Sequence, residues 1–277
     1  MNFPQFWARG SKGDFICWRW SFQSVAEAQT LANQAVETLA AMIRAGKYPP
    51  KYGGYYPNRP FREEILQEFK NEAGEIVAVI TRNSYGCEVL NTARLMFVDI
   101  DLPEPKAPGL FKRLFGKPDV APPHNPQTEA IARIESWSRA HPEWGWRIYR
   151  TRAGLRLLAT QSLIDADSDL VESIFEALGA DPLYRKLCKA QKCFRARLTP
   201  KPWRCGVSGK PERWPYLDAK AERKFQKWNA HYRSSCGGVA VCEFLSRIGN
   251  PEVHLDIQSL LAIHDDISRA ESKLPLA

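Results

Sequence analysis

The heptapeptide LMFVDID at residues 95–101 joins an apolar run to two aspartates. Side chains alternate along a strand, so Asp99 and Asp101 would share one face while Val98 and Ile100 point into a core. Two carboxylates at the end of a buried strand repel each other, and a divalent cation such as Mg²⁺ or Mn²⁺ would relieve that repulsion. The pattern predicts a strand at residues 94–101 with an acidic end, although Asp-x-Asp also occurs in turns and helix caps.

Outward from this strand, hydrophobic periodicity and turn residues predict an α+β protein. The expected helices are residues 25–45, 128–140, 169–178, 219–231 and 254–270. The expected strands are residues 15–22 (buried), 64–70, 75–82, 146–150, 155–160 and 194–198. The Pro-rich residues 103–126 show little periodicity, and we expect a mobile insertion that covers the two aspartates as a flap.

Bulk composition limits the class of protein. The chain has 277 residues, 44 % of them hydrophobic and 25 % charged, which is enough to bury a core without disulfides. Seven scattered cysteines do not suggest a secreted disulfide framework. No apolar run is long enough for a membrane helix, and residues 1–10 do not resemble a signal peptide. We therefore expect a soluble, cytoplasmic protein without a membrane partner.

Positive charge is concentrated in one part of the chain. The formal net charge is +8, and residues 185–233 hold fifteen Lys and Arg but only three acids. Aromatic residues are interleaved with these cations: Trp203, Trp214, Tyr216, Phe225, Trp228 and Tyr232. Phosphate contacts combined with stacking faces are typical of single-stranded nucleic-acid binding. A solvated basic helix over the edge of a core is the alternative interpretation.

Three motifs follow one another: the DID at residues 99–101, YRTRAGLRLL at 149–158 and CFRARLTPKP at 193–202. Their order resembles the archaeo-eukaryotic primase superfamily, which includes the primase-polymerases. The resemblance implies an RRM-like antiparallel sheet as catalytic core, with flanking helices. It also implies acids that bind two metal ions, and a His and basic residues that contact the triphosphate of an incoming nucleotide.

Carried over to this chain, the resemblance implies catalytic and metal-binding roles for Asp99, Asp101 and a third acid. Asp181 is the candidate for the third acid, with Asp165 and Asp167 as alternatives. Arg156 stands where the family has its second-motif His; arginine holds a phosphate but cannot accept a proton. The expected nucleotide- or phosphate-binding residues are Thr151, Arg152, Gly154, Arg156, Arg195, Arg197 and Lys201. The expected nucleic-acid contacts are Trp203, Arg204, Lys210, Arg213 and Trp214.

These observations suggest three segments: an α+β segment at residues 1–93, a primase-like core at 94–202 and a basic helical region at 203–277. The leading functional hypothesis is a Mg²⁺- or Mn²⁺-dependent nucleotidyltransferase acting on single-stranded or template-primer nucleic acid with nucleoside triphosphates. A second hypothesis is a degenerate, non-catalytic nucleic-acid-binding protein with a replication or regulatory role on the same fold. A third is a metal-dependent nuclease.

Other chemistries have less support. The Cys and His residues between positions 188 and 242 lack the compact spacing of zinc ligands, which favours buried structural thiols over zinc. We interpret His264, Asp265 and Asp266 as a solvated helix face. The sequence contains neither a P-loop nor a Gly-x-Gly-x-x-Gly motif, which disfavours ATPase and dinucleotide-binding functions.

Overall fold

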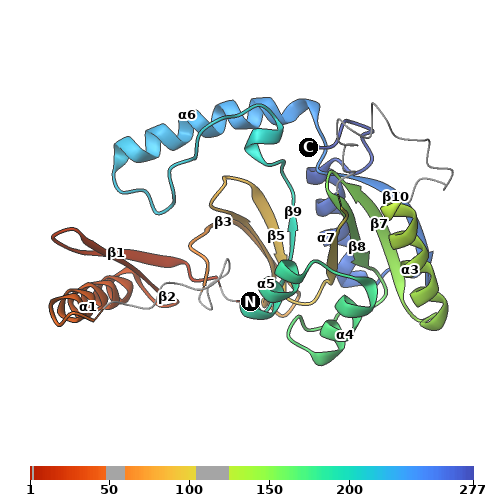
Figure 1. Cartoon of the computed structure of the whole chain (residues 1–277), viewed down its shortest axis with the longest axis horizontal. Helices are drawn as coiled ribbons and strands as arrows, with labels where there is room; N and C mark the ends of the chain where they lie inside the picture. Colours follow the sequence, from red (N-terminus) through yellow and green to blue (C-terminus); the bar gives the residue numbers. More distant parts are fainter. Residues whose placement is uncertain (2, 48–59, 104–124) are drawn as a thin grey trace, which may run out of the picture.

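The computed structural model describes residues 1, 3–47, 60–103 and 125–277. It confirms an α+β fold with antiparallel sheets and flanking helices (Figure 1). Most of the insertion expected at residues 103–126 lies outside the described residues, and so does its expected role as a flap. Among the described helices, none has the length and apolar character required to cross a membrane.

A four-stranded sheet, which we call the central sheet, carries the Asp-x-Asp motif. Its order is β10 (Cys242–Gly249), β7 (Gly145–Thr151), β8 (Gly154–Ala159) and β6 (Phe97–Asp101), with every pairing antiparallel. Helix α3 (Pro126–Ala140) packs Trp137 against Trp146 on one face, and helix α7 (Leu255–Ser268) covers the other (Figure 1). Both faces are therefore buried, and Asp99 lies on the face that α7 covers.

The β7–β8 hairpin and the strand with the two aspartates confirm sequence predictions, and β6 begins three residues later than expected. Gly154, the first residue of β8, lies very close to the backbone of β6. A Cβ on this residue would lie 1.9 Å from the carbonyl oxygen of Ile100. Only glycine therefore lets β8 approach β6 closely enough to pair, which gives this motif residue a structural role.

A second sheet adjoins the central one. It has the order β3 (Glu64–Lys70), β4 (Ile76–Arg82), β5 (Glu88–Thr92) and β9 (Phe194–Arg197), again antiparallel. Helices α4 (Asp169–Leu178) and α5 (Pro182–Gln191) lie between β8 and β9 in the chain. β5 pairs with β9, and β10 pairs with β7, so both sheets cross the expected boundaries at residues 93 and 202.

The amino-terminal residues form a unit of their own. β1 (Phe6–Lys12) and β2 (Phe15–Ser21) pair only with each other, and α1 (Val25–Arg44) packs on one side of the hairpin. A Cβ on Gly10 would lie 2.2 Å from the carbonyl oxygen of Ala32, which marks the covered side. Trp18 and Trp20 point to the other side and are half-buried. The strand expected at residues 15–22 is confirmed as β2, but its expected burial is wrong, because α1 covers only one face.

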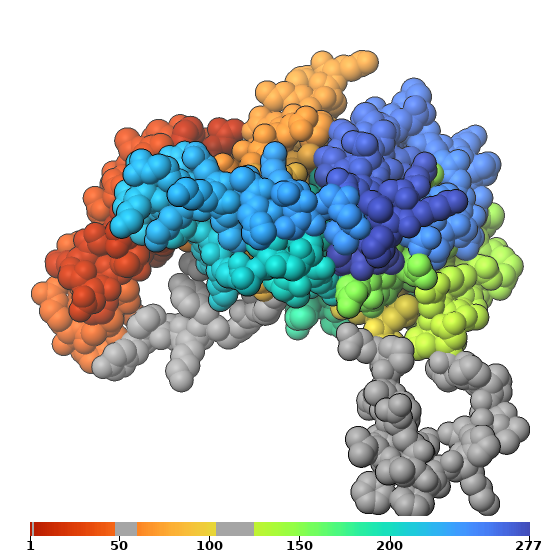
Figure 2. All heavy atoms as spheres, turned by 90° about the horizontal axis from the view of Figure 1, so that it is seen from above, coloured from red at the N-terminus to blue at the C-terminus, as the bar shows by residue number. Residues whose placement is uncertain are grey.

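The basic region contains two short helices, η1 (Pro202–Arg204) and η2 (Cys236–Gly238), and the long helix α6 (Ala219–Ser235). α6 runs across one side of the molecule (Figures 1 and 2). Its buried residues are Phe225, whose ring lies under the guanidinium of Arg82 at the end of β4, and Tyr232, which contacts Pro200. A Cβ on Gly86 in the turn between β4 and β5 would lie 2.3 Å from Cη2 of Trp228, so glycine is required where the helix packs.

Candidate functional site

Asp99 is held by a buried arginine. The two residues are directly opposite each other in the β6–β8 pairing. Nε of Arg156 donates to Oδ1 of Asp99 at 2.8 Å and Nη2 donates to Oδ2 at 3.2 Å. Arg156 is 2 % exposed, whereas the side chain of Asp99 is 30 % exposed. The guanidinium that the family resemblance assigns to a triphosphate is thus already paired with a carboxylate in a bidentate geometry.

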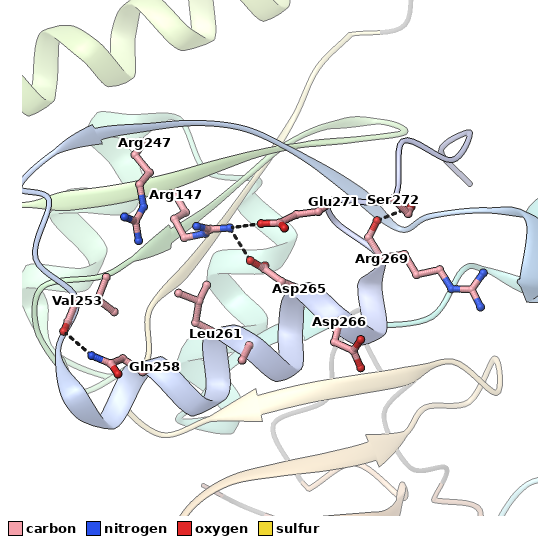
Figure 3. A pocket seen from close by; sticks show the side chains of 11 residues that line it. Arg147, Arg247, Val253, Gln258, Leu261, Asp265, Asp266, Arg269, Glu271 and Ser272 are labelled. Atoms are coloured by element: carbon pink, nitrogen blue, oxygen red, sulfur yellow. Dashed lines mark hydrogen bonds and ion pairs between the residues drawn. The ribbon is translucent and has the colours of Figure 1, made fainter.

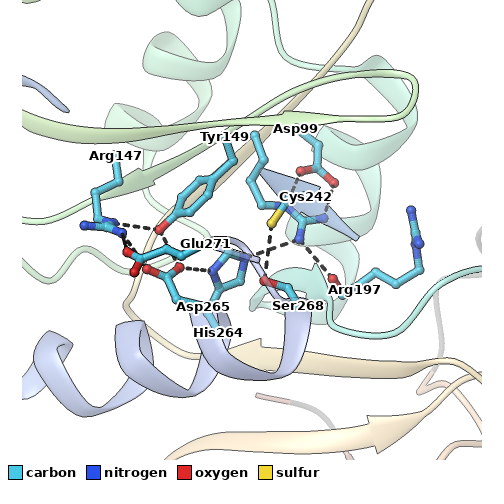
Figure 4. Close-up of polar contacts among 10 residues, drawn as sticks. Asp99, Arg147, Tyr149, Arg197, Cys242, His264, Asp265, Ser268 and Glu271 are labelled. Carbon is cyan, nitrogen blue, oxygen red and sulfur yellow. Dashed lines mark hydrogen bonds and ion pairs between the residues drawn. The ribbon is translucent and has the colours of Figure 1, made fainter. Parts of the chain in front are cut away.

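A chain of polar contacts continues from Arg156 beneath α7 (Figure 4). Nη1 of Arg156 lies 3.4 Å from Nε2 of His264, and Nδ1 of His264 lies 2.9 Å from Oδ1 of Asp265. The hydroxyl of Tyr149 donates to the same Asp265 oxygen at 2.7 Å, and Nη2 of Arg147 donates to Oδ2 at 2.6 Å. These partners satisfy a set of buried charges that would otherwise be costly.

His264 is fully buried, so its interpretation as part of a solvated helix face is wrong. Burial lowers the pKa of its imidazole below the ordinary value, and the Arg156 charge lowers it further, although Asp265 acts in the opposite direction. The buried residues of α7 are Ile257, Leu260, His264 and Ser268. That helical spacing places His264 on the apolar stripe, and it was the available sequence signal for a core histidine.

The chain of contacts ends at a pocket of about 720 Å³ beside α7 (Figure 3). Arg147, Arg247 and Arg269 line it together with Asp265, Asp266 and Glu271. The three cations and three acids balance one another, so the pocket has no strong preference for an anion or a cation. No residue with a predicted catalytic or phosphate-binding role lines it.

The third predicted acid lies next to the first two. The backbone N–H of Asp181 donates to the carbonyl oxygen of Asp99 at 2.9 Å. The carboxylate of Asp181 accepts the backbone N–H of Tyr184 at 2.8 Å and so caps α5. Burial raises the pKa of Asp101, and the charges of Asp181 and Asp99 raise it further. The structure thus brings three carboxylates together at the end of β6.

The two alternative acids lie elsewhere. Asp165 pairs with Arg94 at 3.2 Å, and Asp167 pairs with Lys192 at 3.0 Å; both aspartates have exposed side chains. The acidic charges that raise the pKa of Asp101 are those of Asp181 and Asp99. Asp181 is therefore the acid that the fold places beside the Asp-x-Asp motif.

Three cations lie near the acids: Arg197 at the end of β9, Lys201 just before η1, and Arg204 in η1. We call them the cation cluster. Burial lowers the pKa of Arg197, and so does the charge of Arg156. Burial, Arg197 and Arg204 lower the pKa of Lys201. These shifts arise because positive groups are crowded together while partly removed from water, and a bound anion would relieve the repulsion.

The other predicted phosphate contacts are arranged differently. Nη2 of Arg195 donates to both carboxylate oxygens of Glu63 at 2.9 Å, and both side chains are 7 % exposed. This arginine belongs to a buried ion pair and does not reach the surface. Thr151 is half-buried at the end of β7, and Arg152 is exposed, with Nη1 3.4 Å from the carbonyl oxygen of Leu276.

The predicted nucleic-acid contacts form a mostly exposed group. Lys210 and Arg213 are exposed, Arg204 and Trp214 are half-buried, and Trp203 is 54 % exposed. Tyr85, which the sequence did not single out, lies against Trp203 with ring centroids 5.3 Å apart. It comes from a turn more than a hundred residues earlier in the chain, so no local sequence pattern could have indicated the contact.

The family resemblance implies metal ions held by Asp99, Asp101 and Asp181. Among the described residues, no group of three or more His, Cys, Asp or Glu side chains is arranged to hold a metal. Asp99 is engaged by Arg156 and Asp181 caps α5, so two of the three expected ligands already have strong partners. Metal ions bound by these acids would have to compete with Arg156 for Asp99 and with the cap of α5 for Asp181.

The cysteine thiols lie in several separate parts of the structure. Cys188 and Cys193 are fully buried beside β9, and Cys242 contacts Ser268 at 3.3 Å. Cys205 and Cys236 are half-buried and neighbour each other between η1 and η2. In the described part of the chain the cysteines are therefore split among separate locations.

Comparison with protein-family models, with curated proteins and with solved structures found no match to this chain. The family resemblance consequently rests on the three sequence motifs.

Proposed function

We propose that this chain is a nucleic-acid-binding protein whose cation cluster and helix α6 hold the phosphates, and that Arg156 serves the fold. The observation that carries the proposal is the cation cluster itself. Arg197 and Lys201 have lowered pKa values because burial and neighbouring positive charges act on both. Binding of phosphate oxygens between these cations would offset their mutual repulsion and so lower the free energy of the cluster.

Helix α6 supports the same function. Lys220, Arg223, Lys224 and Lys227 are exposed and stand at positions i, i+3, i+4 and i+7, which places them along one stripe of the helix. Only Lys224 has an acidic partner among the described residues, Glu212 at 3.6 Å. We call these four residues the α6 stripe. Its spacing suits contact with successive phosphates of a nucleic-acid backbone.

The two basic features are mechanically connected. The hydroxyl of Tyr232 on α6 donates to the carbonyl oxygen of Pro200 at 2.6 Å and lies 2.8 Å from Oγ1 of Thr199. Both partners lie in the segment that joins β9 to η1. The α6 stripe and the cation cluster are therefore fixed relative to each other, which reduces the ordering cost of binding one ligand across both.

The pairing of Asp99 with Arg156 favours the non-catalytic form of the proposal. In the resembled family the first acid holds metal, whereas here both of its oxygens accept from a buried guanidinium. A Mg²⁺- or Mn²⁺-dependent nucleotidyltransferase remains the second candidate. The observation in its favour is the crowding of Asp101, Asp181 and Asp99, which raises the pKa of Asp101.

Binding should be measured by fluorescence anisotropy with labelled single strands and duplexes between 50 and 200 mM salt. Loss of two phosphate contacts in Lys201→Ala/Arg204→Ala should reduce the slope of log K against log[salt] by about 1.4 on a single strand. Lys12→Ala/Arg94→Ala removes two exposed cations from other parts of the molecule and should leave the slope unchanged. No binding by the wild type at 50 mM salt would refute the proposal.

A parallel assay separates the candidates by chemistry. Labelled ribo- and deoxyribonucleotides are supplied with a template, with and without primer, in Mg²⁺ and in Mn²⁺. We expect no product. Product from the wild type that is lost in Asp101→Asn would establish the nucleotidyltransferase, and strand degradation without added nucleotides would establish a nuclease. Asp101 is the suitable position because its side chain has no pairing with buried Arg156.

A further inference from the structure

Two exposed aromatic side chains meet beside the cation cluster. Trp203 is 54 % exposed and Tyr85 is 37 % exposed, and their rings form an edge-to-face pair with centroids 5.3 Å apart and planes at 80°. Nζ of Lys201 lies 5.6 Å from the centroid of the Trp203 ring. An aromatic face that remains open to solvent next to an ammonium group offers both stacking and charge to a ligand.

Both segments that carry these rings are fixed by hydrogen bonds. The side-chain oxygen of Asn83 accepts the backbone N–H groups of Tyr85 at 2.9 Å and of Cys87 at 3.1 Å. In η1, the backbone N–H of Arg204 donates to the carbonyl oxygen of Lys201 at 2.8 Å. Sγ of Cys87 lies 3.4 Å from the carbonyl oxygen of Pro200 and ties the two segments together. The backbone that carries the two rings is thus fixed before any ligand arrives, which lowers the ordering cost of binding.

The chemistry of this surface selects one form of nucleic acid. Bases in a duplex are already stacked on their neighbours, whereas an unpaired base has a free π-face. We propose that Trp203 and Tyr85 form a stacking platform for an unpaired base of a single strand, whose neighbouring phosphates contact Lys201 and the rest of the cation cluster. This inference rests on the proposed function and specifies its ligand as single-stranded.

The test compares three probes of equal length: a pyrimidine single strand, the same strand with abasic sites throughout, and a duplex. The abasic strand keeps the phosphates and lacks the bases. Trp203→Ala should weaken binding of the normal strand by about five- to 150-fold and leave binding of the abasic strand unchanged. Tyr85→Ala should act in the same direction, and Trp203→Phe should retain most of the affinity because it keeps a ring.

Phe22→Ala supplies the matched control, because Phe22 is an exposed aromatic residue, 60 % exposed, in the amino-terminal unit. It should change none of the affinities. An equal loss on normal and abasic strands in Trp203→Ala would overturn the platform, as would an unchanged affinity for the normal strand. Failure of the proposed function looks different, since the wild type would then bind neither the normal nor the abasic strand.

Discussion

Arg195 and Arg197 are two residues apart on the same strand and on the same face, yet their surroundings are opposite. Arg195 is 7 % exposed and paired with both oxygens of Glu63. Arg197 lies one pleat further along, with no ion-pair partner among the described residues and other cations nearby. A ligand anion can stabilise only the second kind of arginine, because the first kind already has its counter-ion.

Other basic residues of the molecule fall into the same two groups, those paired with a carboxylate and those without such a partner among the described residues. Arg147 and Arg156 on the central sheet resemble Arg195, since each has a carboxylate partner beneath a helix or strand. Lys201 of the cation cluster and Lys220, Arg223 and Lys227 of the α6 stripe resemble Arg197, whereas Lys224 pairs with Glu212 at 3.6 Å. We therefore expect substitutions in the first group to change stability and substitutions in the second to change binding.

The largest effect should come from breaking the Asp99–Arg156 pair. Asp99→Asn leaves a buried guanidinium without its counter-ion and should lower the free energy of unfolding by about 3–5 kcal/mol. Urea denaturation followed by circular dichroism measures this change. Asp101→Asn is the matched control on the same strand and face, and it should not destabilise the protein because it removes one of three carboxylates that repel one another. Equal destabilisation by both variants would contradict the comparison.

The next largest effect should be a change in nucleic-acid binding that leaves the stability of the protein unchanged. Arg223→Ala/Lys227→Ala removes half of the α6 stripe and should reduce the salt slope for a single strand by about 1.4, with the unfolding curve unchanged. Lys186→Ala/Lys189→Ala removes two exposed cations of α5, which belong to the same basic stretch of sequence. If nucleic acid follows α6, this second pair should leave the slope as it is. Identical slopes in the two variants would show that binding depends on total charge alone.

The smallest effect should be a change in pH dependence. The folded-state pKa of His264 lies below its ordinary value of 6.5, because the buried ring resists a proton beside Arg156. Below pH 6.5 the unfolded chain binds a proton that the folded chain does not, so stability falls as the pH drops from 6.5 toward the folded pKa. His264→Gln should flatten that part of the stability curve.

Denaturation at a series of pH values between 7.5 and 5 checks this expectation. The control is His231→Gln, which removes an exposed histidine of α6 and should leave the shape of the curve unchanged. A His264→Gln curve parallel to that of the wild type would show that His264 does not titrate differently in the folded state.

Local patterns predicted the local elements well. The helix expected at residues 25–45 is confirmed as α1, and the strands expected at residues 146–150 and 155–160 are confirmed as β7 and β8. β5 and β10 were missed, and so were β1 and α5. Their short or mixed segments carry no clear period, and the pairing of β5 and β10 depends on strands about a hundred residues away in the chain.

The sequence predicted where the acidic residues of the site lie, but it did not predict which side chains they contact. The Asp-x-Asp motif correctly indicated a strand whose two carboxylates share a face, and Asp181, the candidate third acid, lies beside them. What the residues contact could not be read from the sequence, because Arg156 has the same appearance whether it faces a phosphate or Asp99. The roles of His264 and Tyr85 likewise depend on packing between distant segments.

The pairing of late strands with early ones has a consequence for synthesis on the ribosome. The amino-terminal unit is complete once residue 44 has emerged, since β1, β2 and α1 contact one another. The β7 edge of the central sheet, by contrast, stays open until β10 has emerged about ninety residues later. At translation rates of about 5–20 residues per second, that edge is exposed for on the order of 5 to 20 seconds. An unpaired edge is a site for pairing with other chains, so we expect the nascent protein to depend on chaperone protection during this interval.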